Sequence, residues 1–336
     1  MTASPIGRVT GVEFDDPVLE SAIREGLETV EAMLRRSVES ADPFVTEAAS
    51  HLVAAGGKRV RPLLALLASQ FGDAAAPQIV PAAVVVELTH LATLYHDDVM
   101  DEASLRRGSP SANKRWDNTI AILTGDYLFA RASDLLADLG PEAVRIQART
   151  FARLVEGQIR ETVGPAQGED AVEHHLSVVA DKTGSLIATS GRFGALFAGA
   201  SADEVEVLTS YGQLIGVAFQ LSDDIIDVAS ETGASGKTPG TDLREGIATL
   251  PVLYALRSGG AQGDGLRAAL DAAATGSDQA VAQALALLRA HPAMDEARAT
   301  LATYADEAKA AATELPDGSA RQALETLADF VVARTG

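Results

Sequence analysis

Helical periodicity is the feature of this sequence that most limits its fold. Apolar residues recur at helical spacing along nearly the whole chain. No stretch shows convincing two-residue alternation, and no Asn-Gly or Asp-Gly pair joins two apolar runs as a hairpin turn would. Abundant Ala and Leu, with only 4% aromatic residues, also favour helices. We therefore expect an all-α protein. The predicted helices cover residues 16–40, 44–55, 60–71, 79–100, 117–138, 141–163, 171–199, 203–229, 249–257, 265–274, 278–291, 294–312 and 318–335.

Charge and composition limit the partners of the chain. Its formal net charge is −20, and an acidic surface repels nucleic acid and anionic lipid. The absence of cysteine excludes disulfides, thiolate metal sites and a cysteine nucleophile. The first residues lack the layout of a signal peptide, and the longest apolar runs look too short to span a bilayer. We expect a cytoplasmic protein without stable membrane insertion.

No low-complexity linker divides the sequence, which predicts a single domain over residues 1–336. Three segments are expected to be non-helical: the glycine break and basic residues at 56–59, a basic loop at 103–115, and a Gly-rich segment at 231–246. A loop as long as the last one is usually functional.

Two acidic clusters, HDDVMD at 96–101 and QLSDDIID at 220–227, are the strongest chemical signal. Each contains Asp-Asp-x-x-Asp at the end of an apolar helix. Residues four apart share a helix face, so Asp97 and Asp101 point the same way. Like charges at this spacing cost roughly 0.2–0.5 kcal/mol each, which indicates compensating cations. Oxygen ligands without His or Cys favour Mg²⁺ over zinc.

A single cluster of this kind fits a solvated helix end equally well. Two copies, each followed by a basic loop, favour a cation site over that simpler interpretation. If the ligand is a diphosphate, its site must be local, because the acidic surface as a whole repels anions. A few Lys and Arg side chains, bound metal, or both would have to provide it.

The residues from about 50 to 255 resemble the trans-isoprenyl diphosphate synthases (polyprenyl synthetases). The resemblance rests on GGKRVRP at 56–62, LYHDDVMDEASLRRG at 94–108, the Lys-Thr pair at 182–183 and FQLSDDIID at 219–227. It implies an all-α bundle around a central cavity, with the two acidic motifs facing each other across its mouth. It also implies a homodimer.

The resemblance assigns roles to individual residues. It implies that Mg²⁺ is bound by Asp97, Asp101 and Asp223, with Asp98 assisting. The residues implied to bind the allylic substrate are Arg106, Lys182, Thr183 and Lys237, and Gln220 takes part in substrate binding. Those implied to bind isopentenyl diphosphate are Gly57, Lys58, Arg61, His90 and Arg107.

The sequence departs from this family pattern at a few positions. Many relatives have basic residues where Ile247 and Thr241 stand, so one or two of the family's phosphate contacts are expected to be missing. His174 and His175 match no motif and are interpreted as solvated.

The implied reaction ionises the allylic diphosphate with metal and basic residues, and the double bond of isopentenyl diphosphate then attacks the allylic cation. Ala92 and Thr93 lie roughly 6–7.5 Å deeper than Asp97 along the helix. Both are small, which favours a long polyprenyl product. A shorter farnesyl or geranylgeranyl product remains the alternative.

Three other classes compete with this hypothesis. A terpene cyclase shares the ionisation chemistry but does not need Lys58, Arg61 and Arg107. A non-catalytic subunit of a heteromeric synthase usually lacks one acidic motif, whereas this chain has both. A metal-binding helical scaffold would leave the basic motifs and their order unexplained.

Overall fold

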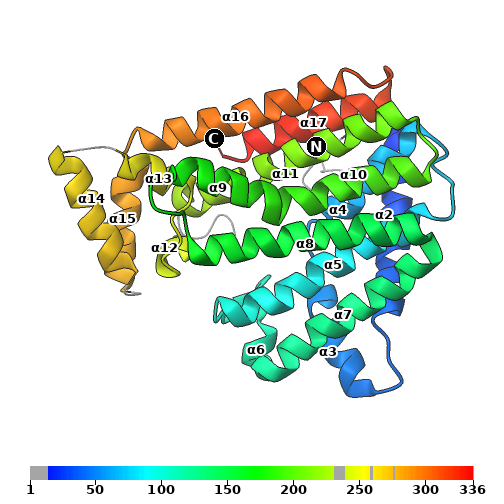
Figure 1. Ribbon diagram of the computed structural model, residues 1–336, viewed down its shortest axis with the longest axis horizontal. Helices are drawn as coiled ribbons and strands as arrows, with labels where there is room; N and C mark the ends of the chain where they lie inside the picture. The colour runs from blue at the N-terminus through cyan, green and yellow to red at the C-terminus, as the bar shows by residue number, and fades with distance from the viewer. Residues whose placement is uncertain (1–13, 231–238, 258–259, 275–276, 336) are drawn as a thin grey trace. The chain divides into compact units, whose positions relative to one another are not determined.

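The computed structural model describes residues 14–230, 239–257, 260–274 and 277–335. Within these residues nearly all regular structure is helical, which confirms the predicted all-α class (Figure 1). The contacts divide the chain into two compact units. Unit 1 comprises residues 1–152, 185–213 and 309–327, and unit 2 comprises 153–184, 214–308 and 328–336. The prediction of a single domain over 1–336 stays a prediction.

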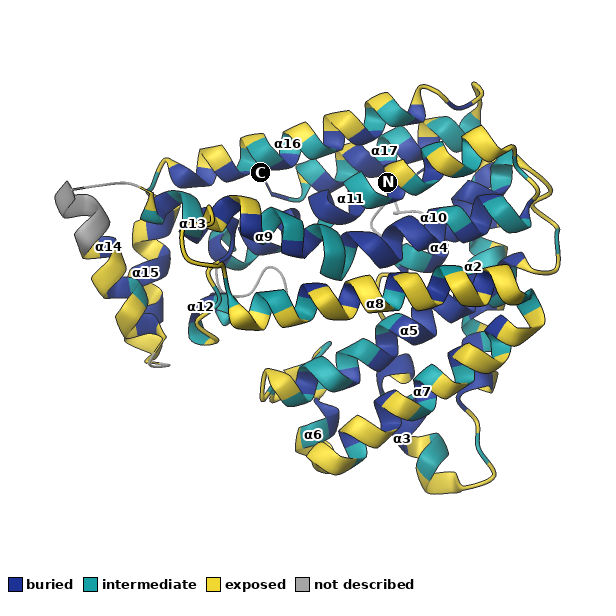
Figure 2. Ribbon diagram, viewed as in Figure 1, coloured by how far each residue is buried: buried dark blue, intermediate teal, exposed yellow. Residues whose placement is uncertain are grey.

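Unit 1 is built around one apolar helix. Its elements are α2 (Pro17–Ser37), α3 (Pro43–Ala54), α4 (Val60–Ala68), the 3₁₀ turn η1 (Ser69–Phe71), α5 (Ile79–Met100), α6 (Ala112–Arg115), α7 (Asn118–Leu139) and α10 (Ser185–Phe197). Helix α5 is apolar on nearly all sides, and such a helix is stable in water only when buried. It contacts α2, α4, α7 and α10, and Figure 2 shows it largely in the buried and intermediate colours.

Unit 2 contains shorter helices. They are α9 (Ala171–Val179), the π-helix η2 (Ala180–Gly184), α12 (Thr241–Arg244), α13 (Leu250–Leu256), α14 (Gly260–Ala273) and α15 (Asp278–Arg289). Four long helices contribute residues to both units: α8 (Pro141–Val163), α11 (Ala202–Ala229), α16 (Ala293–Ala312) and α17 (Ser319–Ala333).

Local signals explain where several helices begin and end. Asp16 and Asp42 accept hydrogen bonds of 2.8 Å from the first backbone amides of α2 and α3, each of which has proline in its first turn. Asp117 caps α7 in the same way. Gly140, with φ of 98°, ends α7 in a conformation that side chains disfavour.

Two sequence expectations about secondary structure are wrong. The loop at 103–115 contains an antiparallel pair of two-residue strands, β1 (Leu105–Arg106) and β2 (Ser109–Pro110), followed by α6. Its turn residues Arg107 and Gly108 both have positive φ, 53° and 76°, as in a type I′ hairpin turn. The segment predicted as one helix at 171–199 is interrupted by η2.

Helix α5 also corrects the expectation that every apolar segment is too short to span a bilayer. By length and composition alone, Ile79–Met100 is the one such helix among the residues that the structure describes. However, 67% of its apolar window is buried inside the protein. The core helix of a folded domain gives the same signal, and the packing of α5 fits that interpretation.

Candidate active site

The first acidic motif ends α5 in unit 1, and its three carboxylates have different surroundings. Asp98 is fully buried, and the Nε of Arg106 donates to its Oδ1 at 2.6 Å. A terminal nitrogen of Arg106 lies 3.8 Å from Oδ2 of Asp101, which is exposed. Burial lowers the pKa of Arg106, but the negative charges of Asp98, Asp97 and Asp101 more than compensate and the net pKa is raised. Asp98 therefore positions Arg106.

The hairpin after α5 brings Arg107 onto the glycine break. Arg107 donates from Nη1 to the carbonyl oxygens of Gly56 and of Leu52, the latter at 3.3 Å. Gly57 has φ of 151°, and a Cβ atom there would lie 2.8 Å from the guanidinium carbon of Arg107. A side chain at position 57 would therefore displace the Arg107 guanidinium, a constraint that the sequence did not reveal.

Arginines surround His90 in unit 1. Burial lowers the pKa of His90 well below its usual range, and the positive charges of Arg61, Arg107, Arg59 and Arg106 lower it further. The imidazole is therefore neutral near pH 7. Burial also lowers the pKa of Arg61, to about 10, so Arg61 stays protonated. Its Nε is buried and makes no hydrogen bond within the described chain. These predicted residues together form a local positive site.

Arg59 has a structural role in this cluster. It pairs with Glu31 at 3.0 Å and with the buried Glu87 at 2.8 Å, and it adopts a left-handed backbone conformation with φ of 49°. Sequence reasoning missed both glutamates. A carboxylate at position 87, within the otherwise apolar α5, was the available signal, because a buried charge needs a partner.

Unit 2 joins several predicted residues through a chain of polar contacts. Thr183 donates to the side-chain oxygen of Gln220 at 3.2 Å, and the Gln220 amide donates to Oδ1 of Asp224 at 2.9 Å. The Nε2 of His175 lies 3.3 Å from Oδ2 of Asp224, a buried carboxylate. Thr183 and Gln220 therefore lie together, and His175 on α9 lies close to the buried carboxylate of the acidic motif.

The interpretation of His174 and His175 as solvated is wrong. His174 is only 7% exposed and lies 3.2 Å from a carboxylate oxygen of Glu169. His175 is partly buried against Asp224. Each imidazole lies near a carboxylate: Glu169, just before α9, for His174, and Asp224 on α11 for His175.

The other two carboxylates of the second motif also have close partners. Arg334 donates from Nη2 to Oδ1 of Asp223. Asp227 accepts the backbone amides of Thr241 and Asp242, each at 3.2 Å, and so fixes the start of α12. Thr241 thus contributes a backbone contact here. Lys237 lies outside the described residues.

Lys182 lies within the π-helix η2. Its ammonium is 2.5 Å from a carboxylate oxygen of Glu161 on α8. A Cβ atom at Gly157 would lie 2.7 Å from the backbone nitrogen of Lys182, so glycine permits close packing of α8 against η2. The neighbouring Asp181 accepts hydrogen bonds from Arg153 and Arg160 at 2.6 and 3.2 Å. Single-turn π-helices of this kind are frequent at functional sites.

The predicted chain-length positions lie in the core of unit 1. Ala92 is fully buried and Thr93 is half-buried. One turn before Thr93, the buried Thr89 accepts a 2.8 Å hydrogen bond from the side-chain amide of Gln147 on α8. The oxygen of that amide has no hydrogen-bond partner among the described residues. This buried polar pair gave no sequence signal, because its residues come from different helices.

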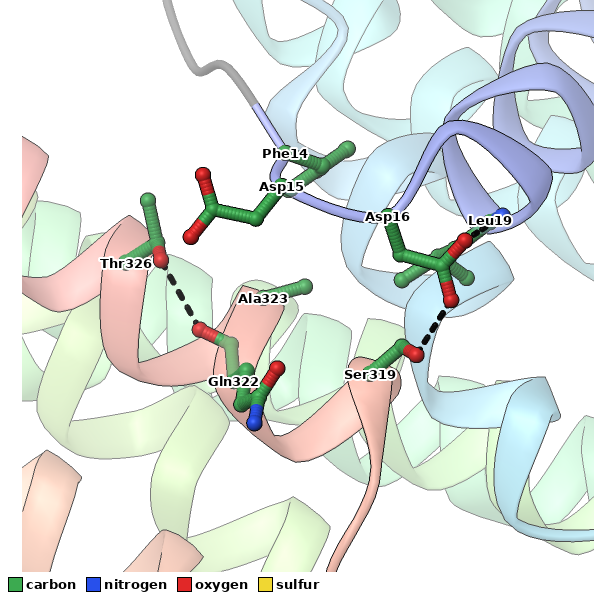
Figure 3. Close-up of a pocket in the computed structure, with 8 residues that line it drawn as sticks. All are labelled: Phe14, Asp15, Asp16, Leu19, Ser319, Gln322, Ala323 and Thr326. Carbon is green, nitrogen blue, oxygen red and sulfur yellow. Dashed lines mark hydrogen bonds between the residues drawn. The ribbon is translucent and has the colours of Figure 1, made fainter.

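A pocket in unit 1 lies apart from these residues. Figure 3 shows it between the start of α2 and α17, where Asp16 contacts Ser319. Its volume of about 10 Å³ leaves room for roughly one water molecule. A larger hollow of about 490 Å³ lies beside it, and neither is lined by a motif residue. Neither is a candidate for a diphosphate site.

Comparison with known proteins identifies the family. The sequence pattern described as "Polyprenyl synthetase" matches residues 42–288. A nonaprenyl diphosphate synthase of Mycobacterium tuberculosis is 51% identical over 336 residues, covering 99% of both chains. A dimethylallyltranstransferase of the same organism is 41% identical over 326 residues, covering 97% of this chain and 99% of the relative.

A solved structure agrees with these relatives. It is a geranylgeranyl pyrophosphate synthase from Corynebacterium glutamicum, complexed with calcium and isoprenyl diphosphate, with 47% identity and a TM-score of 0.84. It covers 97% of this chain and 100% of its own. The chain belongs to the polyprenyl synthetase family, as its motifs predicted, and is a prenyltransferase.

Proposed function

We propose that this prenyltransferase joins isopentenyl diphosphate head to tail (1'-4) to an allylic diphosphate in a Mg²⁺-dependent reaction that yields a long all-trans polyprenyl diphosphate. The observation that carries the proposal is that Arg61 has a buried Nε without a hydrogen-bond partner among the described residues, while Arg107 is held on the carbonyl oxygens of Leu52 and Gly56, and the charges of both arginines lower the pKa of His90. On a chain of net charge −20, such a cluster is a specific anion site.

Isopentenyl diphosphate is assigned to this cluster. Arg61 has an unpartnered buried Nε, which suits a phosphate oxygen. Neutral His90 donates or accepts one hydrogen bond without adding charge, and Lys58 and Arg107 supply further positive charge. Gly57 shapes the site by leaving room for Arg107.

The allylic diphosphate is assigned to Arg106, Lys182, Thr183, Gln220 and Lys237. Because Glu161 pairs with Lys182 and Asp98 pairs with Arg106, these cations are oriented before substrate arrives. Preorganised charge of this kind stabilises a departing diphosphate without further reorganisation.

Asp97, Asp101 and Asp223 are assigned as Mg²⁺ ligands. No group of three or more His, Asp or Glu residues forms a ready metal cluster within the described ranges. Mg²⁺ retains waters and is usually bound by one or two carboxylates together with substrate phosphates. Oδ2 of Asp98 is buried without a hydrogen-bond partner in the described chain, which indicates that this carboxylate can accept a further partner. The metal would neutralise the diphosphate and so improve it as a leaving group.

A long product is supported by the small side chains at Ala92 and Thr93. The relatives differ, since the M. tuberculosis relative is named for a nonaprenyl chain and the C. glutamicum structure for a geranylgeranyl chain. We assign the longer product because neither position carries a bulky side chain that would obstruct a growing tail.

A homodimer is supported by exposed apolar side chains. Ile122 and Leu123 on α7 are 43% and 58% exposed. On α8, Val144, Val155 and Ile159 are also exposed, and Figure 2 shows exposed positions in yellow along this helix. A second copy of the chain would cover such side chains.

Product chain length tests the proposal. Purified protein is incubated with labelled isopentenyl diphosphate, farnesyl diphosphate and Mg²⁺, with EDTA as control. We expect products longer than geranylgeranyl diphosphate that disappear with EDTA. A ladder that stops at farnesyl or geranylgeranyl diphosphate refutes the long product and retains the class of reaction. No incorporation with any primer refutes catalysis by this chain alone and favours a partner-dependent subunit.

A further inference from the structure

Arg334, which follows α17, lies against the second acidic motif of unit 2. Its Nη2 donates to Oδ1 of Asp223. Its guanidinium carbon lies 4.6 Å from the ring centre of Phe219 and 6.0 Å from that of Phe330. Only 12% of the Arg334 side chain is exposed. A guanidinium that stacks on aromatic faces is held in one orientation, so this contact is built into the fold.

The hydrogen bonding of Arg334 is incomplete. Its Nη1 is buried and has no hydrogen-bond partner within the described residues. A buried donor without an acceptor is unfavourable, and oxygens of a bound anion would satisfy it. Arg334 therefore has one nitrogen on Asp223 and another available to a ligand.

We propose that Arg334 couples metal binding at Asp223 to the binding of a diphosphate. This inference rests on the proposed function, in which Asp223 is a metal ligand. A guanidinium and a divalent cation repel each other and require the same carboxylate, so each weakens the binding of the other. A diphosphate offers the guanidinium new acceptors and so relieves this competition. Arg334 is thus a positioning residue that makes the metal bind together with substrate.

Linkage gives the coupling a measurable form. If diphosphate strengthens metal binding by a given factor, metal strengthens diphosphate binding by the same factor. Mn²⁺ and inorganic pyrophosphate serve as probes, since neither needs turnover. In the native protein Mn²⁺ should bind weakly alone and more tightly with pyrophosphate.

The test measures Mn²⁺ affinity of the full chain by calorimetry and paramagnetic resonance, with and without pyrophosphate. Arg334→Gln should bind Mn²⁺ alone about tenfold more tightly than the native protein, within the 5–150-fold range usual for coupled sites. The further increase in Mn²⁺ affinity that pyrophosphate causes should be correspondingly smaller in this variant than in the native protein. Arg334→Lys keeps the charge and should behave more like the native protein.

Arg298→Gln is the matched control. Arg298 is a half-buried arginine of unit 2 that pairs with the exposed Asp295 at 3.1 Å on α16, so its loss changes the net charge equally. We expect it to leave both affinities unchanged. Arg334→Met keeps an unbranched apolar side chain beside Phe219, and it is used in place of Arg334→Gln if Arg334→Gln has a lower unfolding midpoint.

Unchanged or weaker binding of Mn²⁺ alone by a folded Arg334→Gln or Arg334→Met protein overturns the inference. Asp223→Asn separates this result from failure of the proposed function. If Asp223→Asn binds as many Mn²⁺ ions as the native protein, the metal assignment itself fails. If it loses an ion while Arg334→Gln changes nothing, only the coupling fails.

Discussion

The two Asp-Asp-x-x-Asp sequences have the same spacing and different partners. On α5 in unit 1, Asp98 is the buried member and pairs with Arg106 from the following hairpin. On α11 in unit 2, Asp224 is the buried member and contacts His175, while Asp227 accepts two backbone amides. The spacing thus determines which carboxylates share a helix face, and the surrounding fold determines which of them have structural roles.

Asp97→Asn should have the largest effect, because it removes an assigned metal ligand from the first motif. We expect kcat to fall by about three orders of magnitude, since metal stabilisation of charge supplies several kcal/mol. Steady-state incorporation of labelled isopentenyl diphosphate measures this loss. Asp138→Asn, an exposed position on α7, is the control. Activity within tenfold of native would show that the first motif is not the metal site.

Gly57→Ala should have the next largest effect. The new methyl group would displace the Arg107 guanidinium, so KM for isopentenyl diphosphate should rise about 10–100-fold, as expected for a lost charged hydrogen bond of roughly 1.5–3 kcal/mol. Gly56→Ala is the matched control, because Gly56 also has positive φ, 79°, but faces open space. Equal effects from both substitutions would indicate backbone strain instead of displacement.

Asp227→Asn tests directly whether the second acidic motif differs from the first. The two backbone amides bond different oxygens of Asp227, and asparagine keeps only one of these oxygens, so one hydrogen bond is lost and the free energy of unfolding should fall by about 1 kcal/mol. Activity should fall by less than about tenfold, far less than with Asp97→Asn, because the side chain acts through the position of α12. Denaturant unfolding and kcat test both parts. A loss as large as that of Asp97→Asn, without a stability change, would make the two motifs equivalent.

The smallest expected effect concerns the charge of His90. Its folded pKa lies well below 6.5, so below pH 6.5 the unfolded chain binds a proton that the folded protein does not. Stability therefore falls as the pH drops through 6.5, by on the order of 1 kcal/mol per pH unit for this group. His90→Gln should reduce that decline between pH 7.5 and 5.5 in urea unfolding. An identical decline would contradict the neutral imidazole.

Much of the fold was predictable because the helices are long and periodic. The predicted bounds of 79–100 and 141–163 match those of α5 and α8. The strands β1 and β2 were missed because two residues are too few to show alternation, and the turn Arg107-Gly108 is not a common hairpin signal. The π-helix was missed because one additional residue in a turn does not alter the apolar pattern.

The site was predictable where its residues belong to short motifs. Asp97, Arg106 and Arg107 fall within one stretch of sequence, and the structure places Arg106 on the motif's own Asp98. The contacts of His175 and Arg334 with the second motif were not predictable. His175 reaches the motif from α9, and Arg334 reaches it from the residue after α17. Arg334 lies 111 residues from Asp223, and no local spacing links positions so far apart.

The packing of α5 has a consequence for biosynthesis. Its covering helices include α10, which ends at Phe197, almost a hundred residues after α5 itself ends at Met100. At a synthesis rate of about 5–20 residues per second, that interval lasts roughly 5–20 s. During this time the emerging chain carries a 22-residue apolar segment without its complete cover. A long core helix of the finished enzyme is therefore also a segment of the nascent chain that a chaperone would protect.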